Sequence, residues 1–245
     1  MHSIQYGNKR IDYEIKRGNR EKTVAIHVGP VPIVTVSTPR LLGEEKIRSI
    51  VRRKARWIIE KQELLKRSRP PASKEFVSGE SFPYLGRQYR LKVTRAAIEN
   101  GGTCKLVNGR LLVEIDGSLG GEDGKKAVRA ALGAWYLTHA EYKLRVRTAR
   151  FAWQLGRSPQ RILIKEQRTR WGSCSRTAII RFNWKIITAP LSVVDYVIVH
   201  ELCHLIHPHH SPSFWKQVES MLPDYQERRR LLKSYSSPKD LWESS

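Results

Sequence analysis

A five-residue motif in the second half of the chain places the strongest constraint on the fold: His200-Glu201-Leu202-Cys203-His204. In an α-helix, residues four positions apart lie on the same face, so His200 and His204 can offer two ring nitrogens to one metal ion. Glu201 then lies next to the ion, where its carboxylate can take a proton from a metal-bound water. The motif therefore predicts a helix that carries a metal centre, with zinc as the expected ion.

A third ligand has to come from the segment that follows this helix. His207, His209 and His210 all lie there, and Pro208 ends the helical pattern between the first and second of them. His207 would stay close to the helix and would not point back at the ion, whereas a histidine beyond the turn can fold back. We therefore predict that His210 completes a site for one zinc ion. Three protein ligands leave a fourth position for water, which is the catalytic arrangement.

The hydrophobic pattern divides the chain into two expected regions. Residues 1–120 are rich in alternating, strand-like segments, including a hairpin with its turn at Asn108-Gly109, and they contain an amphipathic helix at residues 44–67. Residues 121–245 begin with a long helical pattern and end with the motif helix and two shorter helices. The expected fold class is α+β, with a β-rich first region and a catalytic core in the second.

The net charge is the second constraint, because 45 lysines and arginines face only 23 aspartates and glutamates, which gives +22. Such a field attracts anions such as nucleic acid, nucleotides, acidic lipid or acidic protein tails, and nucleic acid bound through the basic surface is one candidate partner. The basic face of the helix at residues 44–67 fits that role, or it is a solvated face over a packed apolar stripe. Charge alone does not choose between these interpretations.

The composition also indicates where the protein works. Hydrophobic residues make up 40% of the chain, no apolar run approaches the length of a transmembrane span, and the first residues lack the apolar core of a secretory signal. The three cysteines, Cys104, Cys174 and Cys203, lie far apart and form no CxxC pair. We therefore expect no transmembrane segment and a reducing, cytoplasmic location.

Four stretches of the chain resemble the YgjP-like metallopeptidase domain family: Tyr84–Leu91, Arg170–Ser175, Asn183-Trp184, and the motif helix through His210–Trp215. The resemblance implies a zincin-like catalytic domain, distantly related to SprT-like and WLM-type proteases. In such a domain a twisted, mainly antiparallel sheet lies over the helix that presents HExxH. The resemblance also implies that His200, His204 and His210 bind the metal and that Glu201 is the general base.

The arginine-rich segment before residue 177 supplies candidate substrate-binding residues: Arg168, Arg170, Trp171 and Arg176. In zincins, an edge strand above the metal helix holds an extended peptide, and residues 170–176 are our candidate for that strand. The arginines can instead clamp phosphates, since guanidinium groups bind oxyanions in a bidentate manner. Trp171 either stacks on a base or packs in the core.

These features support three functions. The first is a zinc metallopeptidase that acts on a peptide or protein through a zinc-bound water and Glu201. The alternative is a metal-dependent nucleoside triphosphate pyrophosphohydrolase acting on UTP-type nucleotides, an activity with which the resembled family has been linked. The third is a nucleic-acid-associated protease or binding module, in which the basic surface holds the nucleic acid.

Overall fold

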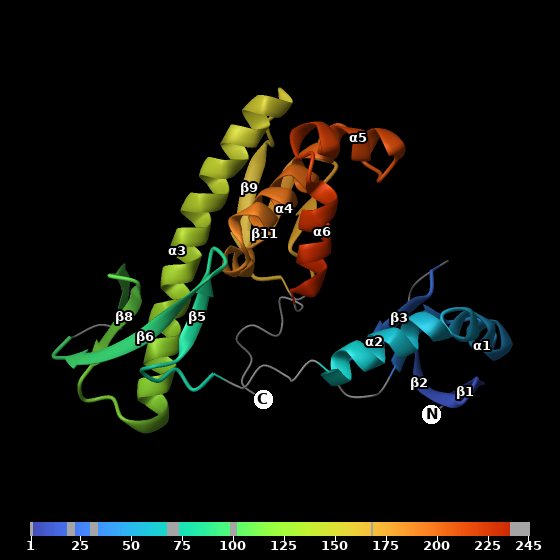
Figure 1. Cartoon of the computed structure of the whole chain (residues 1–245), viewed down its shortest axis with the longest axis horizontal. Helices are drawn as coiled ribbons and strands as arrows, with labels where there is room; N and C mark the ends of the chain where they lie inside the picture. Colours follow the sequence, from blue (N-terminus) through green and yellow to red (C-terminus); the bar gives the residue numbers. More distant parts are fainter. Residues whose placement is uncertain are drawn as a thin grey trace. The chain divides into compact units, whose positions relative to one another are not determined.

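The structure, a computed structural model, describes residues 2–18, 23–29, 34–67, 74–98, 102–167 and 169–235. Its contacts divide the chain into two compact units, Met1–Ala72 and Ser73–Ser245 (Figure 1). The expected boundary after residue 120 therefore differs from the observed one. The strands after residue 80 pack on the long helix of the second unit, and sequence periodicity contains no information about that contact. Residues 68–73 contain two consecutive prolines and two serines, a composition that predicts a linker or loop, and they lie outside the described residues.

The first unit is a four-stranded sheet with a helical segment packed on it. Its strands are β1 (His2–Tyr6), β2 (Lys9–Gly18), β3 (Ala25–Val28) and β4 (Val34–Pro39), arranged in the order β1-β2-β4-β3. Its own core includes Ile11, Val36, Ile47 and Ile58, all fully buried. This core joins alternate strand residues to one face of the helical segment, as the amphipathic pattern predicted.

The helix expected at residues 44–67 is in fact two helices, α1 (Glu44–Arg53) and α2 (Ala55–Arg67). They are separated at Lys54, whose N–H bonds to the carbonyls of both Ile50, at 3.2 Å, and Val51, at 3.1 Å. This shared bond tightens one turn toward 3₁₀ geometry. The basic residues Lys46, Arg48, Arg52 and Arg53 are exposed on α1, so the face expected to be charged lies in solvent within this unit.

The second unit contains two sheets and the remaining helices. One sheet has the order β5-β6-β8-β7, and the other has the order β10-β11-β9. The strands are β5 (Ser81–Tyr84), β6 (Arg87–Ala96), β7 (Thr103–Val107), β8 (Arg110–Asp116), β9 (Arg161–Lys165), β10 (Gly172–Cys174) and β11 (Ile179–Asn183). The helices are α3 (Gly121–Leu155), the 3₁₀ helix η1 (Trp184–Thr188), α4 (Leu191–Cys203), α5 (Pro212–Met221) and α6 (Tyr225–Ser234). The α+β fold class is confirmed.

The hairpin predicted from the residues Asn108-Gly109 is found in this unit. Strand β7 is antiparallel to β8, and both turn residues have positive φ, as a type I′ turn requires.

The sheet nearest the motif helix is mixed, because β11 pairs antiparallel with β10 but parallel with β9. None of the helices within the described ranges is long and apolar enough to cross a membrane.

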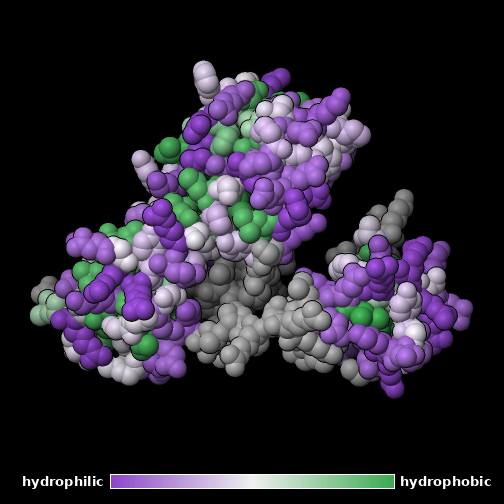
Figure 2. Space-filling view, viewed as in Figure 1, coloured by the Kyte–Doolittle hydropathy of each residue, from purple (hydrophilic) through white to green (hydrophobic). Residues whose placement is uncertain are grey.

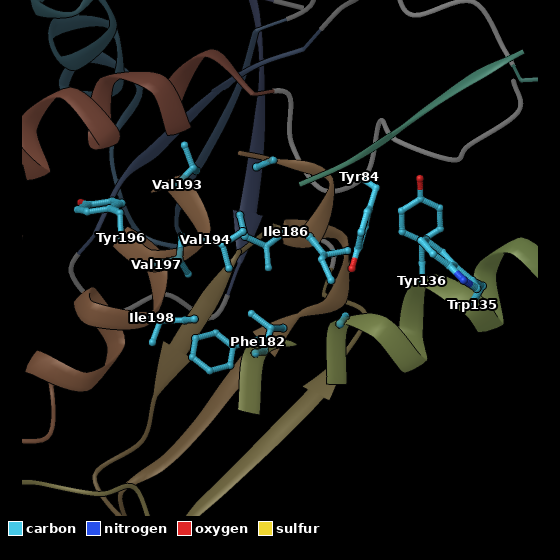
Figure 3. Close-up of a cluster of buried hydrophobic side chains, with 14 of the residues drawn as sticks. Tyr84, Trp135, Tyr136, Phe182, Ile186, Val193, Val194, Tyr196, Val197 and Ile198 are labelled. Carbon is cyan, nitrogen blue, oxygen red and sulfur yellow. The ribbon is translucent and has the colours of Figure 1, made fainter. Parts of the chain in front are cut away.

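Helix α3 runs through the second unit and contacts both of its sheets (Figure 1). Helix α4, which carries the motif, is buried almost along its whole length. Figure 3 shows its side chains packed with residues of β11 and η1 in one apolar cluster. This packing holds α4 in place. On the face of each unit seen in Figure 2, by contrast, most of the visible residues are hydrophilic.

One ion pair fastens α4 to its neighbours. Asp195, which is 7% exposed, accepts bidentate hydrogen bonds from Arg147 of α3, and Arg228 of α6 lies 3.9 Å from the same carboxylate. Arg228 also donates to the carbonyl of Ser192 on α4, at 3.2 Å. Bidentate arginine–carboxylate pairs are among the stronger polar contacts in proteins. The pair therefore links the motif helix to two other helices.

We expect Asp195→Ala to lower the free energy of unfolding by about 3 kcal/mol, because it leaves the Arg147 guanidinium partly buried without its carboxylate. The matched control is Asp123→Ala, which removes an exposed pair with Lys126 and should change stability by less than about 1 kcal/mol. Urea denaturation of both variants measures the difference. Equal losses in the two variants would contradict this role of Asp195.

Candidate metal centre

The metal motif lies on the last turn of α4, and His204 is the residue that caps the helix. The helix begins after Pro190, which has extended backbone angles as the N-terminal cap. His200 and Glu201 are still within the helix, so the spacing places both histidine rings on one side, as expected. The helix ends earlier than Pro208, because the N–H groups of Leu205 and Ile206 bond three residues back and tighten the chain.

Three histidines converge at this point: His200, His204 and His210. One nitrogen of each lies within 4.8 Å of the others, and the Nε2 atoms of His200 and His210 are 3.0 Å apart. His207 and His209 do not belong to this group. The structure thus brings together the three residues selected from the sequence, in an arrangement that can hold a metal ion.

Two contacts orient the histidine rings. The Nδ1 atom of His204 lies 3.0 Å from the carbonyl oxygen of His207, so Nδ1–H donates and leaves Nε2 free to bind a metal. His210 stacks on Trp215, with ring centroids 5.6 Å apart and planes 21° apart. The sequence did not indicate the carbonyl of His207 as a partner, because a backbone group carries no residue-type signal.

The return of His210 to the site depends on the start of α5. Ser211 caps this helix, since its hydroxyl accepts from the N–H of Phe214 at 3.3 Å, and Pro212 occupies the first turn. Phe214 is fully buried, and its ring centroid lies 4.7 to 5.0 Å from those of all three histidines. Phe214 therefore forms an apolar wall behind the histidines, a role that sequence reasoning missed.

The protonation state of the cluster suits a metal. Burial, followed by the neighbouring His204 and His210, lowers the pKa of His200 to about 3. Burial and His204 also lower the pKa of His210. Histidine binds metal only as neutral imidazole, so the rings of His200 and His210 are in the binding form at neutral pH. Three imidazoles are a typical donor set for zinc, and the residues present therefore fit that ion.

Glu201 faces the same site from within the helix. It is 6% exposed, and burial raises the pKa of its carboxyl to about 8, although the nearby Arg170 acts in the opposite direction. A buried carboxyl with a raised pKa next to metal ligands is typical of a residue that exchanges protons in a reaction. The role of Glu201 as general base stays a prediction.

The raised pKa of Glu201 predicts a pH dependence of stability in the metal-free protein. Between about pH 4.5 and pH 8, the folded state keeps a proton that the unfolded state releases, so the contribution of Glu201 to stability falls as the pH rises. We expect the Glu201→Gln variant, which cannot ionise, to gain stability relative to the wild type between pH 5 and pH 9. One pKa unit corresponds to about 1.4 kcal/mol, so the gain is several kcal/mol at most.

Denaturation of both proteins at several pH values, with zinc removed, measures this gain. The lowered pKa of His200 acts in the opposite direction, because stability is lost as the pH falls below about 6.5. That loss is common to both proteins and cancels in the comparison. A difference between the two proteins that stays constant from pH 5 to pH 9 would show that Glu201 titrates normally.

A cavity of about 730 Å³ opens at the histidines and Glu201 and is lined on its other side by residues of β10 and the following turn. Arg170 and Arg176 both line it, as does Cys174. Trp171 does not line this cavity. It packs against the core and borders a smaller cavity of about 240 Å³ next to Glu201. Arg168 lies outside the described residues.

Strand β10 pairs with β11 on one side only, so within the described ranges it is an edge of its sheet. The carbonyl of Trp171 accepts from the N–H of Asn183 at 2.8 Å, and the N–H of Ser175 donates to the carbonyl of Ile179 at 2.9 Å. Backbone groups alternate in direction along an antiparallel strand. Gly172 and Cys174 therefore turn their N–H and C=O groups toward the free edge.

Comparison with known proteins agrees with this geometry. The family described as YgjP-like, metallopeptidase domain, matches the chain over residues 22–235. The chain belongs to this family. It is therefore a metal-dependent hydrolase of the metallopeptidase type, as the resemblance implied.

A solved structure, the metallopeptidase zymogen abylysin of Pyrococcus abyssi, is 22% identical to the chain. The similarity covers 37% of this chain and 94% of that one, with a TM-score of 0.34, which is too low to carry an argument about mechanism. None of the curated proteins compared with the chain matches it.

The stretches that resembled the YgjP-like family meet around α4. In the turn between β5 and β6, the N–H of Leu85 donates to the carbonyl of Ile187 at 2.8 Å. Gly86, with φ of +81°, lies against Pro190 so closely that a Cβ atom would be 2.9 Å from the Cα of Pro190. This turn therefore supports the start of the motif helix, while β10 and the start of α5 border its end.

Proposed function

We propose that this protein is a zinc-dependent metallopeptidase in which His200, His204 and His210 hold one zinc ion and Glu201 is the general base. The observation that carries the proposal is the convergence of three imidazoles beside the buried carboxyl group of Glu201, at a cavity lined by an edge strand. Membership in the metallopeptidase family supports the same conclusion.

The protein groups have separate roles in this reaction. Zinc held by the three histidines would supply the Lewis acidity that makes a water molecule reactive near neutral pH. The pKa of Glu201 would be lower beside a bound zinc ion, because a nearby positive charge favours the ionised carboxylate. In that form Glu201 accepts the proton of the water and later donates it to the leaving amine. Burial keeps this carboxyl away from bulk solvent, so its proton is exchanged within the site.

The free edge of β10 is the proposed binding site for the substrate. The N–H and C=O groups of Gly172 and Cys174 can pair with an extended peptide in the manner of an added strand. Both residues line the cavity that contains the histidines and Glu201. A peptide bound there would cross the cavity with its backbone held in register, which favours a peptide as the substrate.

Digestion of a peptide library and of an unfolded protein tests the proposal. We expect cleavage by the zinc-loaded protein, loss of cleavage after chelation, and recovery after zinc is restored. Metal analysis should find about one zinc per chain. If no peptide or unfolded protein is cleaved under any of these conditions, the peptidase proposal fails.

A second candidate is a metal-dependent nucleoside triphosphate pyrophosphohydrolase, and the positions of Arg170 and Arg176 favour it. Both arginines line the cavity that contains the histidines, and guanidinium groups can bind phosphate oxygens. A panel of nucleoside triphosphates, UTP included, assayed with zinc, manganese and magnesium tests this function. Release of pyrophosphate that is lost in Arg170→Ala would support it, and absence of turnover with every metal would reject it.

A further inference from the structure

Gly172 of β10 lies against the side chain of Glu201. A Cβ atom built on this glycine would lie 2.7 Å from Oε1 of Glu201, 2.8 Å from its Cγ and 3.0 Å from its Cδ. Real Cβ atoms essentially never come closer than 3.0 Å to a heavy atom outside their own residue and its two chain neighbours. The absent side chain therefore leaves the space that the carboxylate of Glu201 occupies.

The backbone conformation does not explain why a glycine is found here. Gly172 is not one of the glycines with positive φ, so any residue could adopt its backbone angles. Gly133 of α3 is a useful contrast, because a Cβ atom there would meet nothing within 4 Å. The close approach to Glu201 is thus the physical requirement for glycine at position 172.

The backbones of β10 and α4, which meet at this contact, are each held in position by other parts of the second unit. Strand β10 is bonded to β11 on either side of Gly172, through Trp171 and Ser175. Helix α4 is held by its buried apolar residues and by Asp195. A methyl group at position 172 would therefore displace the flexible side chain of Glu201 more readily than either backbone.

We propose that Gly172 is a positioning residue, whose lack of a side chain sets where the carboxylate of Glu201 lies relative to the three histidines. The inference rests on the proposed function, since it assigns the placement of the general base. It also explains how the free edge of β10 and the carboxyl group of Glu201 come to lie next to each other. The backbone of Gly172 faces a bound peptide, while its Cα lies against the group that acts on that peptide.

The first test is the Gly172→Ala variant of the full-length, zinc-loaded protein. We expect kcat for peptide cleavage to fall about 100-fold, as a misplacement of about 1 Å can cause, with KM and zinc content retained. The control is Gly133→Ala, which adds the same methyl group in open space and should keep kcat unchanged. Unchanged kcat in Gly172→Ala would overturn the proposal.

The second test measures melting temperatures, with and without zinc, of Gly172→Ala, Glu201→Ala and the double variant. We expect Gly172→Ala to lower the melting temperature when Glu201 is present, and to lower it much less when Glu201 is truncated. Equal losses in both backgrounds would overturn the proposal. If the wild type cleaves no peptide but the two positions are coupled in melting, the peptidase assignment fails while the placement of Glu201 by Gly172 stands.

Discussion

Replacing Glu201 by glutamine is expected to lower kcat for peptide cleavage about a thousandfold, within the range that general acid–base catalysis contributes. Glutamine has nearly the same shape but cannot accept the proton of a water molecule. The carboxylate is buried beside the histidines without being one of the converging ligands, so zinc should still bind. Steady-state kinetics and zinc content, measured on the same preparation, check both statements.

The matched control for this substitution is Glu219→Gln on α5, where the glutamate is exposed and outside the cavity. We expect its kcat to equal that of the wild type. Two results would contradict the assignment of Glu201 as the base. One is full activity of Glu201→Gln, and the other is loss of zinc together with activity, which would make the carboxylate part of the metal site.

Replacing His210 by alanine is expected to weaken zinc binding by more than the 10- to 100-fold that loss of a partner of a metal ligand usually costs. The reason is that His210 supplies one of the three converging nitrogens. With only His200 and His204 left, the ion would have two protein ligands. Competition with a chromogenic chelator measures the affinity, and peptide cleavage should fall in parallel.

Neighbouring histidines provide the controls for His210. His209→Ala should bind zinc as the wild type does, because its ring is exposed and is not part of the cluster. His207→Ala should also keep zinc, since the contact to His204 is made by the backbone carbonyl of His207, which alanine retains. Loss of zinc in either control, with zinc retained in His210→Ala, would show that the third ligand is another histidine.

The sequence by itself determined the features that depend on nearby residues. The i, i+4 spacing of His200 and His204 requires only a helix, and a buried, Val-rich segment ending at the motif made that helix predictable. The turn at Asn108-Gly109 was equally local, because its two residues tolerate positive φ. Pro208 and the later histidines also indicated that the chain turns back after the helix.

Only the tertiary structure decided how distant segments meet. The contacts between residues place the boundary between the two units after residue 72. The fold also brings the carbonyl of His207 to the ring of His204 and packs Phe214 against the histidines. It also placed Gly172 against Glu201, 29 positions away in the chain by their numbers. Such contacts depend on the packing of whole strands and helices, and no periodicity or residue type within a short segment encodes which distant partner it will meet.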